Sequence, residues 1–268
     1  FNNWITDTNK VISIDIETNL PYVDAAREVV AVGIYNAQTK KSEVISDKKA
    51  MTKEEATQVL TRLEQLQNEG YKLVTFNGTG FDLMHLGRLS GNINLAGRIA
   101  VRGIDLMTSL MSDFDSTTST GLSLDAVSTA LEIPSKVDKG LYAVLYWKRM
   151  NGMKLELSDL ATVRKLDDEK LTPERKQEIL DEVNKLNREE AKNKLWTYVQ
   201  DDVVKNHLVF KSLIEKSGTN IRLAKQGYTI ANPRPTWLEG INNHKWNRLI
   251  RQRFATWGPF GREKIDSV

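Results

Sequence analysis

The sequence predicts an α/β fold in which a mixed sheet is flanked by helices, with a charged helical insertion and a basic C-terminal extension. Three observations predict this class: Val- and Ile-rich runs come first, a helical pattern separates two of them, and most of the later chain has helical spacing. With 268 residues, 40% of them hydrophobic, the chain can bury a sizeable core. We expect one large domain over residues 1–218 and an extension over residues 219–268.

The first three runs predict a meander of strands. VISIDIET at residues 11–18 is followed by VVAVGIYN at 29–36 and KKSEVISD at 40–47, and polar residues bound each run. Residues 52–68 then predict a helix, because Thr52 can cap it and apolar residues recur at helical spacing: Val59, Leu60, Leu63 and Leu66.

A fourth strand is predicted at residues 71–77, after Gly70 ends the first helix. A helix at 81–89 follows directly. The next helix, within residues 121–133, has apolar positions that fit packing on a sheet: Leu122, Leu124, Val127 and Leu131. A long helix over roughly 190–215 closes the domain.

Residues 154–194 are dominated by charged side chains and are expected to form an insertion. Within them, residues 173–194 predict one helix with a narrow apolar stripe: Ile179, Leu180, Val183 and Leu186. We expect a solvated helical hairpin. An arm that grips substrate or docks a partner is the alternative.

The first predicted strand carries two acids at its end. Asp15 and Glu17 are two residues apart, so on a strand they point to the same face. Two like charges held that close need a cation or a shared proton.

Two later segments add acids in structured contexts. Asn77 and Asp82 surround two glycines at a strand-to-helix junction, where an Asp is often a helix cap. Tyr198 and Asp202 are four residues apart and share one face of the last helix, which an ordinary amphipathic helix would also explain.

Together the acids form a set of hard oxygen ligands of the kind that Mg²⁺ or Mn²⁺ prefers: Asp15, Glu17, Asp82 and Asp202. Two such ions about 3.5–4 Å apart can activate a water and stabilise the leaving oxygen of a phosphodiester. We therefore expect two divalent cations, Mg²⁺ or Mn²⁺, as cofactors.

In this order and context the set resembles the DEDD superfamily of 3′-to-5′ exonucleases, which have an RNase H-like fold. The matching segments are IDIET, N-x-x-x-F-D from Asn77 to Asp82, and Y-x-x-x-D from Tyr198 to Asp202. Thr197 stands where the histidine branch would have its histidine, so the chain looks like the tyrosine branch, DEDDy. The segments between the motifs look like the proofreading-type exonucleases related to family B DNA polymerases.

The resemblance implies roles for these residues. Asp15, Glu17 and Asp202 would hold the tighter ion and the attacking water, while Asp15 and Asp82 would serve the second ion and the scissile phosphate. Tyr198 would orient the water, acting as a general base only if metals and neighbours lower its pKa well below about 10.

Substrate-binding candidates lie around the motifs and in the tail. Asn77 and Phe81 would shape the pocket, and Thr18 would contact the terminal nucleotide. The extension carries nine Lys or Arg against three acids, and its Trp237, Trp246 and Trp257 are interleaved with cations that include Arg248 and Arg251. Aromatic and cationic side chains hold single strands in this way. The alternative is that the Trp residues pack the tail onto the domain.

Other polar residues are expected to be structural. His85, His207 and His244 are scattered, and a helix-borne histidine is more often packed or exposed than a ligand. We expect Asp105 to cap the helix that follows it, and a metal-binding role is the alternative.

Composition excludes several function classes. The chain has no cysteine, which excludes disulfides, thiolate zinc sites and cysteine nucleophiles, and it has no run of 18 apolar residues. We expect no membrane partner and a cytoplasmic location. Because the sequence begins at Phe1, we also expect it to be a piece of something longer.

These patterns predict a metal-dependent 3′-to-5′ exonuclease that acts on the 3′ end of single-stranded or frayed DNA. An RNA-trimming enzyme of the same architecture is one alternative, because the motifs do not specify the sugar. A non-catalytic nucleic-acid-binding module is the other. A protein partner or a fused domain, reached through the insertion or the basic tail, is a further candidate.

Overall fold

The computed structural model describes residues 8–19, 28–46, 49–113, 122–134, 142–161, 172–216, 221–223 and 228–230. The predicted substrate contacts Arg248 and Arg251, the three tail tryptophans and His244 lie outside the described residues.

The core of the fold is a five-stranded mixed sheet in the order β3-β2-β1-β4-β5. Antiparallel pairing joins β1 to β2 and β2 to β3, whereas β1 pairs with β4 and β4 with β5 in parallel. The predicted meander and fourth strand are confirmed. Their bounds are Val11–Thr18 (β1), Val29–Asn36 (β2), Lys41–Ile45 (β3), Lys72–Thr75 (β4) and Ile104–Asp105 (β5).

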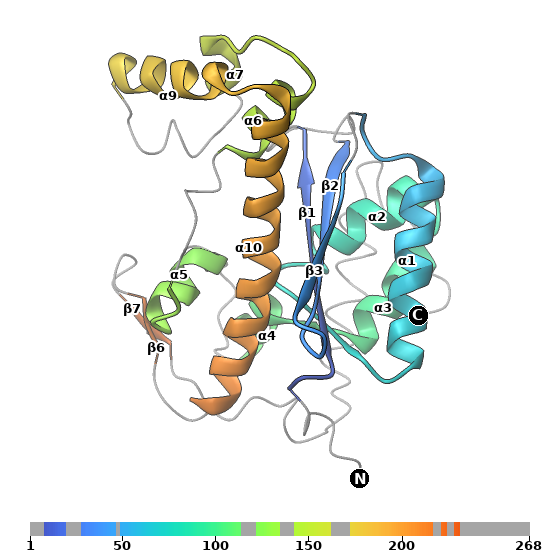
Figure 1. The fold of residues 1–268 in the computed structure, drawn as a ribbon. Coiled ribbons are helices and arrows are strands. Elements are labelled where there is room, and N and C mark those ends of the chain that lie inside the picture. Colours follow the sequence, from blue (N-terminus) through green and yellow to red (C-terminus); the bar gives the residue numbers. More distant parts are fainter. Residues whose placement is uncertain are drawn as a thin grey trace.

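Three helices cover one face of the sheet (Figure 1): α1 (Lys53–Asn68), α2 (Asp82–Ser90) and α3 (Ile93–Arg102). Thr52 caps α1 as predicted, in a capping box with Glu55. The sequence reasoning missed α3, in which Asn92 accepts a hydrogen bond from the Leu95 N–H. The apolar residues of these helices pack against Ile14 and Ile16 of β1 in one buried cluster.

The long helix α10 (Arg188–Glu215) crosses the opposite face of the sheet (Figure 1). In Figure 1, α4 (Leu106–Asp113) and α5 (Leu124–Ala130) lie beside the lower half of α10, and α6 (Ala143–Met150) and α7 (Leu157–Ala161) lie near its upper end. Two short strands, Ile221–Leu223 (β6) and Tyr228–Ile230 (β7), pair antiparallel, and β6 contacts α5. Among the described helices, none is long and apolar enough to cross a membrane.

The prediction of one continuous helix over residues 173–194 is wrong in its second half. The structure has α9 (Pro173–Lys185), then Leu186 in an extended conformation with ψ 137°, and Asn187 capping α10. A solvated hairpin was also expected here. The stripe residues Ile179, Leu180 and Val183 are buried with α6 and α10 in a second apolar cluster, while the other faces of α9 are mostly exposed. Helix α9 also contacts α7, but residues 162–171 lie outside the described residues, so the hairpin stays a prediction.

Gly33 lets α10 approach the sheet closely. A Cβ at Gly33 would lie 2.5 Å from Val199 Cγ1 and 3.2 Å from the Val199 carbonyl oxygen. Contacts this short require the Val199 side chain, or the helix that carries it, to shift. Val199 is one turn from Asp202, so the position of that acid depends on the absence of a side chain at Gly33.

We expect Gly33→Ala to lower the free energy of unfolding by about 1–3 kcal/mol, because the added methyl group overpacks the interface with α10. Urea unfolding measures this. Val199→Ala introduced into Gly33→Ala removes the nearest contact and should recover part of the loss. If Gly33→Ala and wild type unfold with the same urea midpoint, α10 is not packed on the sheet as described.

Candidate functional site

The C-terminal half of β1 presents its two acids on the face covered by α10. Ile14 and Ile16 are buried against the helices of the other face, while Asp15 and Glu17 are half-buried. Since side chains alternate along a strand, the two carboxylates project together toward α10. The register with β2 shifts between Glu17 and Thr18, where β1 ends.

Asp82 joins this region through the backbone of β1. Its Oδ1 accepts a hydrogen bond from the Ile16 N–H at 2.8 Å, and the residue is 2% exposed. The parallel pairing of β1 with β4 ends at Ser13, so beyond that point no strand among the described residues pairs with this side of β1. The Asp82 carboxylate takes that place between Asp15 and Glu17. It therefore links the second motif to the first, instead of simply capping α2.

Asp105 holds the loop that leads to Asp82. Its carboxylate accepts hydrogen bonds from the Asn77 N–H (3.0 Å), the Thr79 N–H (2.9 Å) and the Thr79 hydroxyl. It also accepts from the Thr108 N–H at 3.1 Å, at the start of α4. The predicted capping role is confirmed. The same carboxylate also stabilises Asn77, whose φ of 66° is left-handed.

Helix α10 supplies the remaining predicted residues. Oxygens of Asp15, Glu17 and Asp202 all lie within 4.8 Å of one another, and the Tyr198 hydroxyl hydrogen-bonds to Asp202. The helix is held to β1 by Asn206, whose side-chain amide donates to the Ile14 carbonyl at 3.3 Å. Residues far apart in the sequence thus meet at one end of β1. We call Asp15, Glu17, Asp82 and Asp202 the acidic cluster.

Three carboxyl groups of the acidic cluster have raised pKa values, chiefly because they are buried. Burial raises the pKa of Asp15 well above its usual range, and the charges of Asp82, Asp202 and Glu17 raise it further. Burial raises the pKa of Asp82 to about 7, although the Ile16 N–H partly opposes the shift. The pKa of Asp202 rises to about 6, chiefly by burial, with Tyr198 and Lys205 opposing. Bound cations would reverse these shifts.

Tyr198 is poorly suited to act as a base in this environment. Burial raises its pKa well above 10, and the charges of Glu17, Asp202 and Asp15 raise it further. General-base catalysis by Tyr198 requires a lowered pKa, and the surrounding protein groups raise it instead. The hydroxyl is a hydrogen-bond donor to Asp202, which suits a residue that orients a ligand or a water.

The residues that could hold metal offer carboxylate oxygens alone. Three oxygens within 4.8 Å of one another, with Asp82 beside Asp15, fit the preference of Mg²⁺ and Mn²⁺ for hard oxygen ligands. The donor set therefore fits the divalent cations that the sequence predicted.

Two of the predicted substrate contacts are neighbours in the chain of acidic-cluster residues, and their role stays a prediction. Thr18 is buried at the end of β1, and Phe81 is half-buried directly before Asp82. The Phe81 ring contacts His85 edge-on, with centroids 4.7 Å apart, so that histidine packs against an aromatic ring. His207 is buried beside Tyr35, at 5.5 Å between ring centroids.

Lys205 was missed by the sequence reasoning. Its ammonium lies 2.9 Å from Asp201, 3.4 Å from Asp125 and 3.5 Å from Asp202. Burial opposes its charge, but these carboxylates outweigh burial and raise the pKa of Lys205. Its spacing from Asp201 and Asp202 on one helix was the signal available in the sequence.

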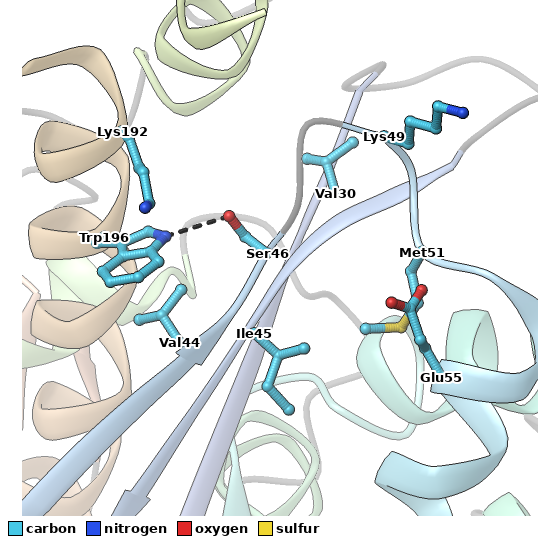
Figure 2. Close-up of a pocket in the computed structure, with 9 residues that line it drawn as sticks. All are labelled: Val30, Val44, Ile45, Ser46, Lys49, Met51, Glu55, Lys192 and Trp196. Carbon is cyan, nitrogen blue, oxygen red and sulfur yellow. Dashed lines mark hydrogen bonds between the residues drawn. The ribbon is translucent and has the colours of Figure 1, made fainter. Parts of the chain in front are cut away.

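A separate groove lies at the sheet edge between α10 and the start of α1 (Figure 2). Trp196 donates from Nε1 to the Ser46 hydroxyl at 3.1 Å, and the Lys192 ammonium lies 4.5 Å from the Trp196 ring centroid. The volume is about 430 Å³, and the lining residues are Val30, Val44, Ile45, Ser46, Lys49, Met51, Glu55, Lys192 and Trp196. The acidic cluster contributes none of them, so the groove is distinct from the candidate metal centre.

Comparison with known proteins identifies the fold. No curated protein matches the chain in a sequence search. A model of the RNase_H superfamily matches residues 12–160, which is more than half of the chain and includes Asp15, Glu17 and Asp82. The match agrees with the observed mixed sheet flanked by helices and supports a nuclease-type function. The chain belongs to the RNase_H superfamily.

Proposed function

We propose that the protein is a metal-dependent 3′-to-5′ exonuclease that hydrolyses the terminal phosphodiester of single-stranded or frayed DNA and releases nucleoside 5′-monophosphates. The observation that carries the proposal is the meeting of Asp15, Glu17 and Asp202 oxygens within 4.8 Å of one another. Asp82 extends the same acidic surface, because its carboxylate binds the backbone between Asp15 and Glu17.

The carboxylates would divide between two ions. Asp15, Glu17 and Asp202 would hold one, and Asp15 with Asp82 would hold the other. Bound divalent cations supply an activated water and neutralise charge on the leaving oxygen. Water adds to phosphorus as the bond from phosphorus to the O3′ of the preceding nucleotide breaks, and that oxygen gains a proton. The products are a chain shorter by one nucleotide and a 5′-monophosphate.

The protein groups themselves orient the reactants. The Ile16 N–H fixes the Asp82 carboxylate, and α10 fixes Asp202 and Tyr198 relative to each other. With its proton retained, Tyr198 would direct its hydroxyl at the reacting water or at Asp202. Positioning of this kind lowers the barrier by reducing the entropy lost on reaction.

A time course with 5′-labelled oligonucleotides in Mg²⁺ or Mn²⁺ tests the proposal. We expect a ladder that shortens one nucleotide at a time from the 3′ end, with EDTA abolishing it. Matched single-stranded DNA and RNA compared side by side distinguish a deoxyribonuclease from an RNA-trimming enzyme. Internal fragments without a ladder would contradict exonuclease action. Tight binding without cleavage across metals and substrates would favour a binding module.

We expect Tyr198→Phe to reduce turnover by about 10- to 100-fold, because it removes the hydroxyl that orients the water or Asp202. Mn²⁺ binding should stay close to wild type, because Tyr198 is not a ligand. Tyr71→Phe is the matched control, since the Tyr71 hydroxyl bonds Gln38, away from the acidic cluster. Initial rates measure both variants. Equal rates for Tyr198→Phe and wild type would remove Tyr198 from the mechanism.

A further inference from the structure

Lys205 is a buried cation that connects the acidic cluster to groups outside it. The residue is 5% exposed, and it lies three residues after Asp202 and four after Asp201 on α10. Its shortest contact, 2.9 Å, is to Asp201. Its longest, 3.5 Å, is to the Asp202 carboxylate. Asp125, on α5, completes the set at 3.4 Å.

The three partners of Lys205 differ in whether they belong to the acidic cluster and in how exposed they are. Asp202 belongs to the acidic cluster, whereas Asp201 and Asp125 are outside it. The side chain of Asp201 is 14% exposed and that of Asp125 is 58% exposed. Lys205 can therefore leave Asp202 and still keep a close, half-buried partner in Asp201. A lysine that faced Asp202 alone would lose its charge compensation on such a move.

We propose that Lys205 is a positioning residue for Asp202: it shares that carboxylate with the divalent cation and competes with the ion for its charge. Without metal, the ammonium holds Asp202 at the acidic cluster and compensates part of the repulsion there. When an ion binds Asp202, the Lys205 ammonium stays paired with Asp201 and Asp125. The inference rests on the proposed function in that Asp202 is taken as a metal ligand.

Direct titration with Mn²⁺ tests the competition without any nucleic acid. We expect Lys205→Met to tighten Mn²⁺ binding by about tenfold, because it removes a positive charge beside a ligand carboxylate. Asp201→Asn should act in the opposite direction and weaken Mn²⁺ binding by about threefold or more, because Lys205 then depends more on Asp202. Calorimetry gives both dissociation constants. Lys211→Met, which removes an exposed lysine of the same helix, should match wild type.

Thermal unfolding separates this role from simple structural support. Lys205→Met should melt at a lower temperature than wild type in EDTA but gain more from saturating Mn²⁺, since the stabilisation grows as binding tightens. A purely structural lysine would lower both melting temperatures equally. If Lys205→Met does not fold, the opposite shift expected in Asp201→Asn decides the inference alone.

Unchanged Mn²⁺ affinity in both Lys205→Met and Asp201→Asn would overturn the inference while leaving the metal centre in place. Failure of wild type to bind Mn²⁺ at all would overturn the inference together with the metal centre and the proposed function. Mn²⁺ binding that follows the predicted shifts, in a protein that degrades no nucleic acid, would support the role of Lys205 and contradict only the exonuclease proposal.

Discussion

We expect Asp15→Asn to reduce degradation of single-stranded DNA by about 1000-fold or more, because it weakens both proposed ion sites and each ion supplies several kcal/mol of transition-state stabilisation. Asp15 is central to the acidic cluster. Its oxygens approach those of Glu17 and Asp202, and the charge of Asp82 is the strongest neighbouring influence on its pKa. Initial rates on 5′-labelled DNA in Mg²⁺ and in Mn²⁺ measure the effect.

The same variant should fold at least as well as wild type without metal. Asn keeps the shape of the side chain but needs neither a buried charge nor the proton that the folded state forces Asp15 to take up, so Asp15→Asn should melt at a higher temperature in EDTA. Asp181→Asn, on the exposed face of α9, is a control that should keep full activity. Undiminished degradation by Asp15→Asn would place the active site elsewhere.

The second large effect concerns pH and stability. In the absence of divalent cations, we expect the free energy of unfolding to fall as the pH rises from about 4 to above 7. The pKa of Asp82 is about 7 in the folded protein and that of Asp202 about 6, whereas an unfolded Asp titrates near about 3.9. At pH values between the unfolded and folded pKa, the folded state binds more protons than the unfolded state. This contribution to stability is therefore greatest below the unfolded pKa and is lost as the pH rises through the folded pKa. For Asp82 alone the loss is about 4 kcal/mol.

Urea unfolding in EDTA at several pH values measures this loss, and Asp82→Asn isolates it. The Asn oxygen can still accept the Ile16 N–H, but the side chain no longer titrates, so the decline with pH should be shallower than in wild type. Burial, and to a lesser degree the charge of Lys211, lowers the pKa of His207. Titration of His207 therefore makes stability rise with pH at low pH. Because wild type and Asp82→Asn both contain His207, comparing their pH profiles cancels this effect. Mn²⁺ should restore the stability of wild type at pH 8. Parallel pH profiles for wild type and Asp82→Asn would contradict the account.

Local patterns were enough to predict which faces carry the acids. Alternation in β1 predicted that Asp15 and Glu17 point the same way, and the four-residue spacing on α10 predicted the pairing of Tyr198 with Asp202. The hydrogen bond from Ile16 to Asp82 could not be predicted in this way, because it depends on where the pairing of β1 with β4 stops.

Other features depended on contacts that a local pattern does not contain. The break between α9 and α10 has no Gly or Pro, and it is made by an extended Leu186 followed by the cap Asn187. One partner of Lys205, Asp125, is 80 residues away in the sequence. In the sequence, Gly33 is an ordinary glycine within a strand. Its role becomes clear only from the structure, where Val199 occupies the space that a side chain at Gly33 would need.

Diffraction from crystals grown with Mn²⁺ and a short oligothymidylate tests the central claim most directly, because Mn²⁺ scatters anomalously. The account predicts an anomalous peak bounded by Asp15, Glu17 and Asp202, with the 3′-terminal phosphate of the oligonucleotide against it. Manganese bound away from these carboxylates, or an oligonucleotide whose 3′ end lies elsewhere on the protein, would contradict it.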